Sequence, residues 1–171
     1  MKPLPLRGPL AVIFMGIAGS GKTTVARLFA ETAHADFYEG DDYHSPENVE
    51  KMRRGIPLTD ADRAPWLAAL RRVIQLSLAA NRVAAITCSA LKASYRSELR
   101  QDDSRVQFVC LAAPKTVLEA RLLTRPGHFL SPSLLAEQLR IFEPPSDALM
   151  VDAQKSPEII VTELLKFFGR P

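Results

Sequence analysis

The residues best suited to chemistry lie near the start of the chain, in the segment Gly16-Ile17-Ala18-Gly19-Ser20-Gly21-Lys22-Thr23. It matches in full the pattern G-x-x-x-x-G-K-[ST], the P-loop. Glycines allow backbone angles closed to other residues and let main-chain N–H groups approach phosphate oxygens. Lys22 can reach the β- and γ-phosphates of ATP, and the Thr23 hydroxyl can join the shell of Mg²⁺. The predicted ATP contacts are Gly16, Ile17, Ala18, Gly19, Ser20, Gly21, Lys22, Thr23 and Thr24.

The surroundings of this loop support a role in phosphate binding. An apolar run, Leu10–Met15, precedes it, and a helical pattern from about Lys22 to Ala33 follows it. The alternative is a glycine-rich turn that joins a strand to a helix and binds nothing. Because the P-loop requires this strand and this helix, whose positive end faces the loop, the pattern favours nucleotide binding. The loop defines the phosphate donor and leaves the acceptor open.

A second polar segment, Glu39 to His44, follows the short strand-like run Asp36–Glu39. Ligands of open α/β sheets bind beyond the carboxyl ends of the strands. A kinase needs a carboxylate there to orient or deprotonate the attacking hydroxyl and to help hold Mg²⁺. The alternative is a solvated acidic turn that caps the next helix. In a chain with a P-loop, the segment favours a role in phosphate transfer.

Strand-like runs alternate with helical patterns, which predicts an α/β fold of the P-loop kinase type with a five-stranded parallel sheet flanked by helices. The expected strands are Leu10–Met15, Asp36–Glu39, Val83–Cys88, Val106–Leu111 and Leu149–Asp152. Six helices are expected. The first runs from about Lys22 to Ala33, the second from a cap at Thr59 through Leu78, and the third follows Lys92 and ends at Arg100. The fourth runs from Pro114 towards Arg125, a short fifth begins near Pro132, and the last runs from a cap at Ser156 to Phe168.

Length and composition indicate one globular domain over residues 1–171, with a proline-broken N-terminal extension at 1–9 that is not a secretory signal. The net charge of +3 suits an anionic ligand but gives no support for a nucleic-acid partner. No apolar run is long enough to span a bilayer, so we expect a cytoplasmic protein without a membrane partner. The two cysteines, Cys88 and Cys110, lie in strand-like runs and are expected to be buried and reduced.

Cationic segments further along the chain are ambiguous alone, because a run of Lys and Arg is usually surface charge. With the acidic segment they form four motifs in one order: Gly40-Asp41-Asp42-Tyr43-His44; Lys51 to Arg63 (K-M-R-R-G-I-P-L-T-D-A-D-R); Cys88 to Arg96 (C-S-A-L-K-A-S-Y-R); and Arg121 through Arg125 to Gly127-His128-Phe129. With these motifs the chain resembles the gluconate kinase family of P-loop sugar-acid kinases, from the first strand to the last helix.

The resemblance implies a reaction of gluconate utilization, in which ATP and D-gluconate give 6-phospho-D-gluconate and ADP. It implies Asp41 as the general base for the 6-hydroxyl, Thr23 and Glu39 at Mg²⁺, and a homodimer. An arginine suits a planar carboxylate, and both Arg63 and Arg96 are candidates for that contact. Thr59 and Asp60 are assigned to helix capping, and Trp66 to core or interface. The implied substrate-binding residues are Asp41, His44, Lys51, Arg63, Lys92, Arg96 and His128.

Residues from about 121 to 132 fit a lid over the nucleotide. Closing such a lid would exclude water, which could otherwise accept the phosphoryl group. The resemblance implies that Arg121 stacks on adenine and that Arg125 reaches the transferring phosphate, which makes Lys22, Asp41 and Arg125 the implied catalytic set. The alternative is that the two arginines are exposed helix charges. Two departures from the family pattern concern Glu39, where the family usually has Asp, and the segment 137–145, where a serine and a phenylalanine are replaced.

Two other functions remain open from the sequence. One is a sibling kinase for another small hydroxy acid such as shikimate, against which the segments Lys51–Arg63 and Ser89–Lys92 speak. The other is a nucleotide-binding switch that uses the P-loop without transferring phosphate, which would have no need of Asp41.

Overall fold

Five parallel strands form one sheet in the computed structural model, which describes residues 6, 8–124 and 132–169. The strand order is β2-β3-β1-β4-β5, and every neighbouring pair is parallel. The predicted α/β fold with a five-stranded parallel sheet is therefore confirmed. The strands are β1 (Leu10–Met15), β2 (Asp36–Tyr38), β3 (Val83–Thr87), β4 (Val106–Ala112) and β5 (Leu149–Asp152).

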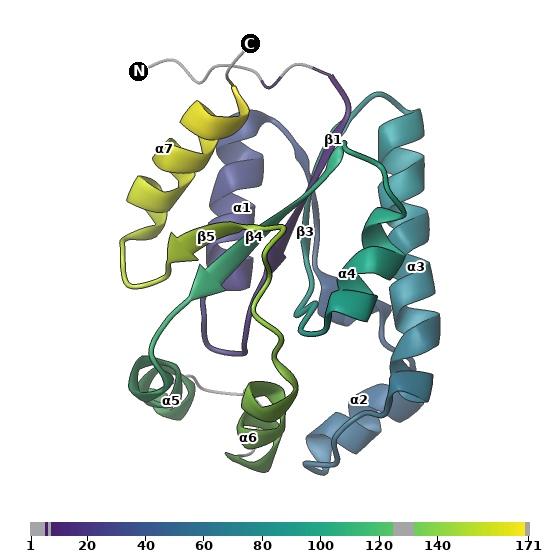
Figure 1. Ribbon diagram of the computed structural model, residues 1–171, viewed down its shortest axis with the longest axis vertical. Helices are drawn as coiled ribbons and strands as arrows, with labels where there is room; N and C mark the ends of the chain where they lie inside the picture. Colours follow the sequence, from purple (N-terminus) through teal and green to yellow (C-terminus); the bar gives the residue numbers. More distant parts are fainter. Residues whose placement is uncertain (1–5, 7, 125–131, 170–171) are drawn as a thin grey trace.

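Helices connect the strands and cover both faces of the sheet (Figure 1). They are α1 (Lys22–Ala33), α2 (Pro46–Arg53), α3 (Asp60–Ala79), α4 (Ala93–Arg100), α5 (Lys115–Thr124), α6 (Pro132–Ile141) and α7 (Pro157–Phe168), with a 3₁₀ helix η1 (Gly40–Tyr43). None of these described helices is long and apolar enough to cross a membrane.

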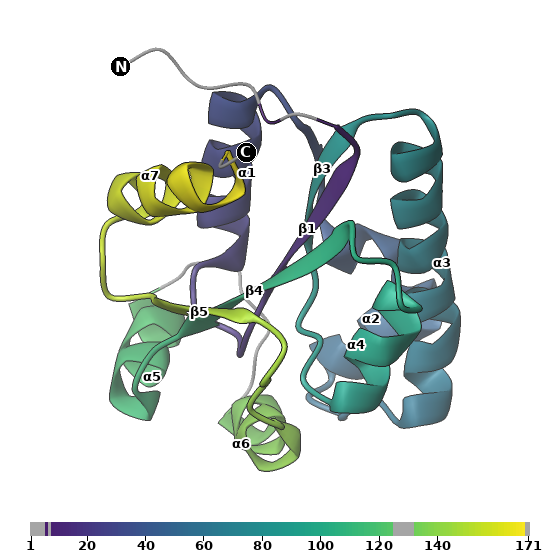
Figure 2. The ribbon, with the colours of Figure 1, turned by 45° about the horizontal axis from the view of Figure 1, so that its top comes forward.

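The residues of β1 alternate between two cores, as the two-residue period of a strand requires. Ala11, Ile13 and Met15 pack with apolar residues of α3 and α4, whereas Val12 and Phe14 pack with those of α1 and α7. Figures 1 and 2 show the two helical layers with the sheet between them. All five side chains are fully buried, so β1 is a central strand buried on both faces, as its continuous apolar run predicts.

Helix starts follow the capping signals in the sequence. The Thr59 side chain accepts from the Asp62 amide at 3.1 Å, and the Asp62 carboxylate accepts from the Thr59 amide at 2.9 Å, a complete capping box. At the start of α7 the Ser156 side chain accepts from the Ile159 amide, ahead of a proline in the first turn. These caps fix where α3 and α7 begin, so the predicted starts at Thr59 and Ser156 are confirmed.

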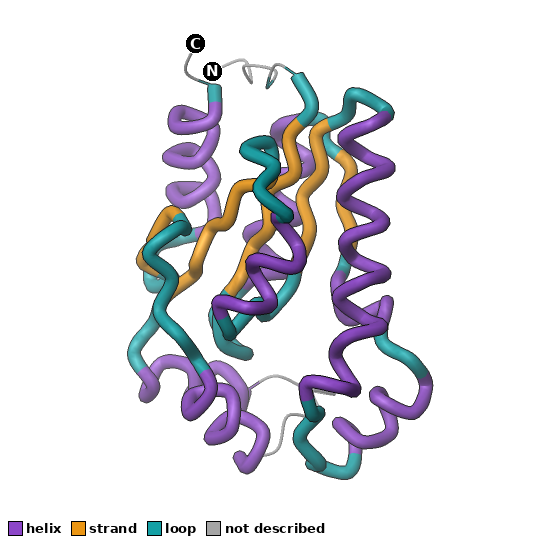
Figure 3. The backbone as a smooth tube through the Cα atoms, turned by 45° about the vertical axis from the view of Figure 1, so that its right-hand side comes forward, coloured by secondary structure: helices purple, strands orange, loops and turns teal. Residues whose placement is uncertain are grey.

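The helices α2, α5 and α6 gather beyond the carboxyl ends of the strands (Figures 1 and 3). Cys88 follows β3 at this end and Cys110 lies in β4, and both are buried with free thiols, as expected. Burial raises the pKa of the Cys88 thiol to about 12, which keeps it protonated and unreactive at neutral pH.

Candidate active site

A single pocket brings the P-loop and the acidic segment together at the carboxyl ends of β1, β2 and β3. Its walls come from the P-loop and the start of α1, the acidic segment, α3 with the chain before it, the end of β3, and α6. Its lining includes Ala18, Gly19, Gly21, Lys22, Thr23 and Thr24 from the loop and α1, Glu39, Asp41 and His44 from the acidic segment, Arg63 and Trp66 from α3, Thr87 at the end of β3 with Cys88 and Ser89 after it, and Glu137 and Gln138 from α6.

The P-loop closes tightly around its own backbone. Gly16 has a φ of +136°, and a Cβ built on it would lie 2.7 Å from the carbonyl oxygen of Leu111, so only glycine fits there. The Lys22 ammonium donates to the carbonyl oxygens of Gly16 at 3.0 Å and Ile17 at 3.2 Å. The lysine thus arches over the loop, and its charge stands where phosphate oxygens would be held.

The N-terminus of α1 opens towards the same pocket. Gly21, with a φ of +95°, is its N-cap, and within α1 no side chain caps the first turn and no acidic residue occupies it. The first N–H groups of a helix need acceptors, and the helix dipole makes this end favourable for anions. The loop, Lys22 and α1 together make a site for phosphate groups.

His44 stands between the acidic segment and α3. Its ring stacks on that of Trp66, with centroids 4.3 Å apart and planes 15° from parallel. Burial, with a smaller contribution from the nearby Arg63 charge, lowers the pKa of His44 below 6.5, although Asp41 opposes the shift. The imidazole is therefore neutral at pH 7, and its buried Nδ1 has no hydrogen-bond partner among the described residues. Trp66 lies in the core, as expected, and it also lines the pocket.

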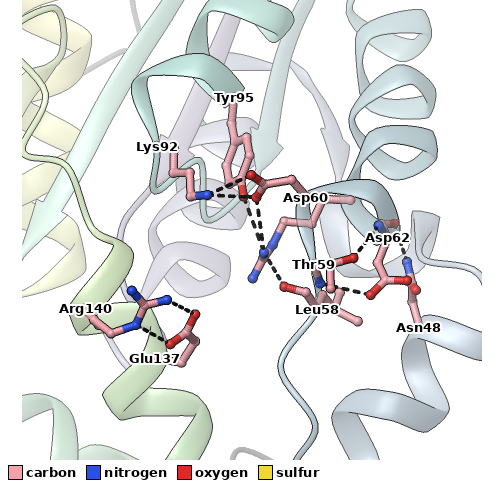
Figure 4. A network of polar contacts seen from close by, with 10 residues as sticks. Asn48, Leu58, Thr59, Asp60, Asp62, Lys92, Tyr95, Glu137 and Arg140 are labelled. Atoms are coloured by element: carbon pink, nitrogen blue, oxygen red, sulfur yellow. Dashed lines mark hydrogen bonds and ion pairs between the residues drawn. The ribbon is translucent and has the colours of Figure 1, made fainter.

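Arg63 is held at the pocket wall by neighbours on two sides. Its guanidinium donates to the Leu58 carbonyl oxygen and, at 3.3 Å, to the Tyr95 hydroxyl. The Asp60 carboxylate lies 3.9 Å from the Arg63 guanidinium. It also forms an ion pair with Lys92 at 2.8 Å and accepts a hydrogen bond from the Tyr95 hydroxyl (Figure 4). Hydrogen bonds from Lys92 and Tyr95 lower the pKa of Asp60, so it stays ionised. Asp60 therefore acts as a shared counter-ion in addition to its place in the first turn of α3.

Lys51, Lys92 and Arg96 are not among the described residues that line the pocket, although the structure places Lys92 against Asp60 beside Arg63. Lys51 forms an ion pair with Asp62 at 2.7 Å. Arg96 is only 4% exposed and donates to the carbonyl oxygens of Ala90 at 3.1 Å and Glu143 at 3.2 Å. Its guanidinium also lies 3.4 Å from Asp147. Of the two candidate arginines, the pocket therefore contains Arg63.

A second hollow lies on the other side of the P-loop, next to Arg121. The Arg121 guanidinium donates to the Ala153 carbonyl oxygen at 2.7 Å and to that of Gly19 at 3.4 Å. The hollow is lined by Gly19, Ser20, Gly21, Thr24, Val25, Arg121, Ala153, Lys155, Pro157 and Ile160. It shares Gly19, Gly21 and Thr24 with the lining of the first pocket, and the predicted stacking of Arg121 on adenine stays a prediction. The predicted residues Arg125 and His128 lie outside the described residues.

The contact between α6 and the P-loop was not predicted. The Gln138 side chain accepts from the amide of Ala18 at 2.8 Å, and Glu137 lines the pocket while pairing with Arg140 at 2.7 Å (Figure 4). In the sequence both residues stand out only as part of the altered segment 137–145. The contact of Gln138 with a loop 120 positions earlier depends on the fold, so no nearby residue pattern predicts it.

The oxygen donors of the pocket fit a magnesium ion. Thr23, Glu39 and Asp41 supply a hydroxyl and two carboxylates, the hard ligands that Mg²⁺ prefers. The described residues contain no cluster of three or more His, Cys, Asp or Glu side chains that could hold a metal by themselves. Magnesium in kinase sites is usually bound by one or two carboxylates together with substrate phosphates, so the residues present suit it.

Comparisons with known proteins agree with this geometry. Residues 12–145 match the family described as AAA domain, and the fold and the loop define a P-loop kinase. The chain is 45% identical to a gluconokinase of Gluconobacter oxydans, over 94% of this chain and 92% of the relative. It is 39% identical to the thermoresistant gluconokinase of Escherichia coli, over 90% of each. A crystal structure of a gluconokinase from Sinorhizobium meliloti gives a TM-score of 0.83 with 42% identity, over 96% of this chain and 94% of that one. The chain belongs to the gluconokinase family.

Proposed function

We propose that this protein transfers the γ-phosphoryl group of ATP to the 6-hydroxyl of D-gluconate, giving 6-phospho-D-gluconate and ADP. One observation carries the proposal: the phosphate-binding loop with Lys22 lines the same pocket as Asp41, His44 and Arg63. A donor site and an acceptor site therefore share one space. Membership of the gluconokinase family supports gluconate as the acceptor.

On the donor side, the loop amides and the start of α1 hold the phosphates of ATP. Lys22 leaves the loop carbonyls for the phosphate oxygens, and Arg121 borders the space for the adenine. Thr23 and Glu39 would hold Mg²⁺, which when bound neutralises charge on the phosphates. The side chains thus orient the γ-phosphoryl group towards Asp41.

On the acceptor side, Asp41 accepts the proton of the 6-hydroxyl as that oxygen bonds to the γ-phosphorus and the bond to ADP breaks. Neutral His44 hydrogen-bonds to the hydroxyls of the polyol. Arg63 meets the carboxylate with its two-pronged guanidinium, and Lys92, paired with Asp60, balances the negative charge beside Arg63. Lys51 and Arg96 contribute by holding α2 and the 143–147 segment in place.

Several further expectations accompany this function. Residues 1–171 are expected to form one kinase domain, and the lid at about 121–132, with Arg125 at the transferring phosphate and His128 at the substrate, stays a prediction. Within that range, residues 121–124 form the end of α5, and Pro132 begins α6. The sequence also suggests a cytoplasmic enzyme with no nucleic-acid or membrane partner, and the family resemblance suggests a homodimer.

Coupled measurement of ADP release with a panel of acids tests the proposal. The panel contains D-gluconate, related sugar acids and shikimate, each with ATP and Mg²⁺. We expect D-gluconate to give the highest kcat/KM. Poor turnover of D-gluconate beside good turnover of shikimate would indicate the sibling kinase, and nucleotide binding without transfer to any acid would indicate a switch.

A further inference from the structure

The backbone of Gly40, one residue before the proposed base, is held on both sides. Its amide donates to the Thr87 hydroxyl at 2.8 Å, and its carbonyl oxygen accepts from the indole nitrogen of Trp66 at 2.7 Å. A Cβ at Gly40 would lie 1.9 Å from the Thr87 carbonyl oxygen, so the turn lies directly against β3. These contacts fix the start of η1, which carries Asp41.

The Thr87 hydroxyl makes a second hydrogen bond, whose direction follows from the first. Because the hydroxyl oxygen accepts from the Gly40 amide, its single proton is free to point elsewhere. That proton goes to the Glu39 carboxylate. Thr87 is 2% exposed, so water does not substitute easily for either bond. One hydroxyl thus joins a proposed magnesium residue to the turn that carries the base.

We propose that Thr87 is a positioning residue for phosphoryl transfer, holding Glu39 and the Gly40–Asp41 turn in one fixed arrangement. The proposal rests on the proposed function and adds a residue outside its motifs. It also explains why glutamate stands at position 39. An aspartate is shorter by one methylene, so its carboxylate would lie too far from the Thr87 hydroxyl. The extra length of Glu39 is therefore used to reach β3.

A small displacement of this turn has a large effect on the reaction. A misplacement of about 1 Å of a catalytic group can lower a rate about 100-fold. Removing the Thr87 hydroxyl frees the Gly40 amide and the Glu39 carboxylate together, while the P-loop contacts of Lys22 remain. The loss should therefore fall on kcat and on magnesium affinity, and ATP affinity without magnesium should stay unchanged.

The experiment compares Thr87→Val, which keeps the shape and removes the hydroxyl, with Thr87→Ser, which keeps the hydroxyl. Thr32→Val is the matched control, because its hydroxyl bonds only to the Leu28 carbonyl within α1 in the described structure. Three quantities are measured for each full-length variant: kcat and KM with D-gluconate, the affinity of the ADP complex for Mg²⁺ by calorimetry, and amide hydrogen exchange over residues 39–43.

For Thr87→Val we expect kcat to fall about 10- to 100-fold, Mg²⁺ affinity to weaken several-fold and exchange at Gly40 to accelerate at least about tenfold. Thr87→Ser and Thr32→Val should stay within about twofold of the wild type in all three. Wild-type values in Thr87→Val, or equal losses in Thr87→Ser, would overturn the proposal. If Thr87→Val does not fold, Thr87→Ala removes the same hydroxyl: slower turnover with faster exchange at Gly40 supports the arrangement, and wild-type values of both overturn the proposal.

The two proposals can fail separately. If the wild type does not phosphorylate D-gluconate, the proposed function fails, whereas hydrogen exchange and Mg²⁺ affinity still report whether Thr87 holds the turn. If the wild type is active and Thr87→Val shows unchanged exchange and kcat, only the role of Thr87 fails.

Discussion

Replacing Arg63 and Arg96 one at a time by lysine separates the two arginines that the sequence leaves equivalent. Arg63 lines the pocket, and its guanidinium can give two charge-assisted bonds to a carboxylate where a lysine gives one. Losing one such bond costs about 1.5–3 kcal/mol. Since about 1.4 kcal/mol is a factor of ten, Arg63→Lys should raise the KM for D-gluconate roughly 10- to 100-fold. Its melting temperature should fall less than that of Arg96→Lys, because Arg63 donates to one protein carbonyl, that of Leu58, whereas Arg96 donates to those of Ala90 and Glu143.

Arg96→Lys should give the opposite pattern. The buried guanidinium serves Ala90, Glu143 and Asp147, and a lysine cannot reach all three. A buried carbonyl left without a donor costs about 1–3 kcal/mol. In a domain of this size each kcal/mol moves the melting temperature by about 2–4 °C, so we expect a fall of roughly 2–12 °C with little change in KM.

Steady-state kinetics and thermal unfolding of both variants decide between the arginines. Arg105→Lys is the control, since Arg105 pairs with Asp103 on the surface and should change neither quantity measurably. A raised KM with an unchanged melting temperature in Arg96→Lys, together with wild-type kinetics in Arg63→Lys, would refute the placement of the substrate carboxylate at Arg63.

Four other substitutions test different parts of the site. Asp41→Asn should keep ATP affinity within about twofold while kcat falls at least about 100-fold, and Lys22→Ala should weaken both ATP affinity and kcat. Calorimetry measures the affinity and coupled kinetics measure kcat. Full turnover in Asp41→Asn would exclude Asp41 as the general base. Gly40→Ala should unfold at a lower temperature and lose activity, because its Cβ would meet the Thr87 carbonyl oxygen; a normal melting temperature would argue against the tight turn. Because burial lowers the pKa of His44, the unfolded chain binds more protons below pH 6.5, so the free energy of unfolding should fall with pH from about 6.5 downwards. Urea unfolding across pH should show a smaller fall in His44→Gln, and an equal fall would contradict this assignment.

The elements nearest to strong local signals were predictable from the sequence. β1, α1 and β5 occupy the predicted residues, and α7 begins after the predicted cap at Ser156, because a glycine loop, an apolar run or a cap marks each boundary. The sequence also predicted that the P-loop and the acidic segment lie together at the carboxyl ends of the strands, because parallel strands end on the same side of the sheet.

What the sequence left open depends on contacts between distant residues. Arg63 and Arg96 carry the same charge, but only Arg96 is held away from the pocket. Its guanidinium donates to the carbonyl oxygen of Glu143, which lies 47 positions later in the chain. Gln138 meets Ala18 across 120 positions, and the Thr87 hydroxyl meets Glu39 across 48. Such pairings depend on the packing of whole elements, so residue type and spacing alone give no indication of them.

Identification of the product tests the central claim most directly. The protein is incubated with ATP, Mg²⁺ and D-gluconate, and the product is examined by ³¹P NMR with correlation to the sugar protons. The account predicts one phosphomonoester coupled to the protons on carbon 6, formed with stoichiometric ADP and absent with Lys22→Ala. Phosphate on another carbon, or only inorganic phosphate, would contradict a pocket that aligns the 6-hydroxyl between Asp41 and the P-loop.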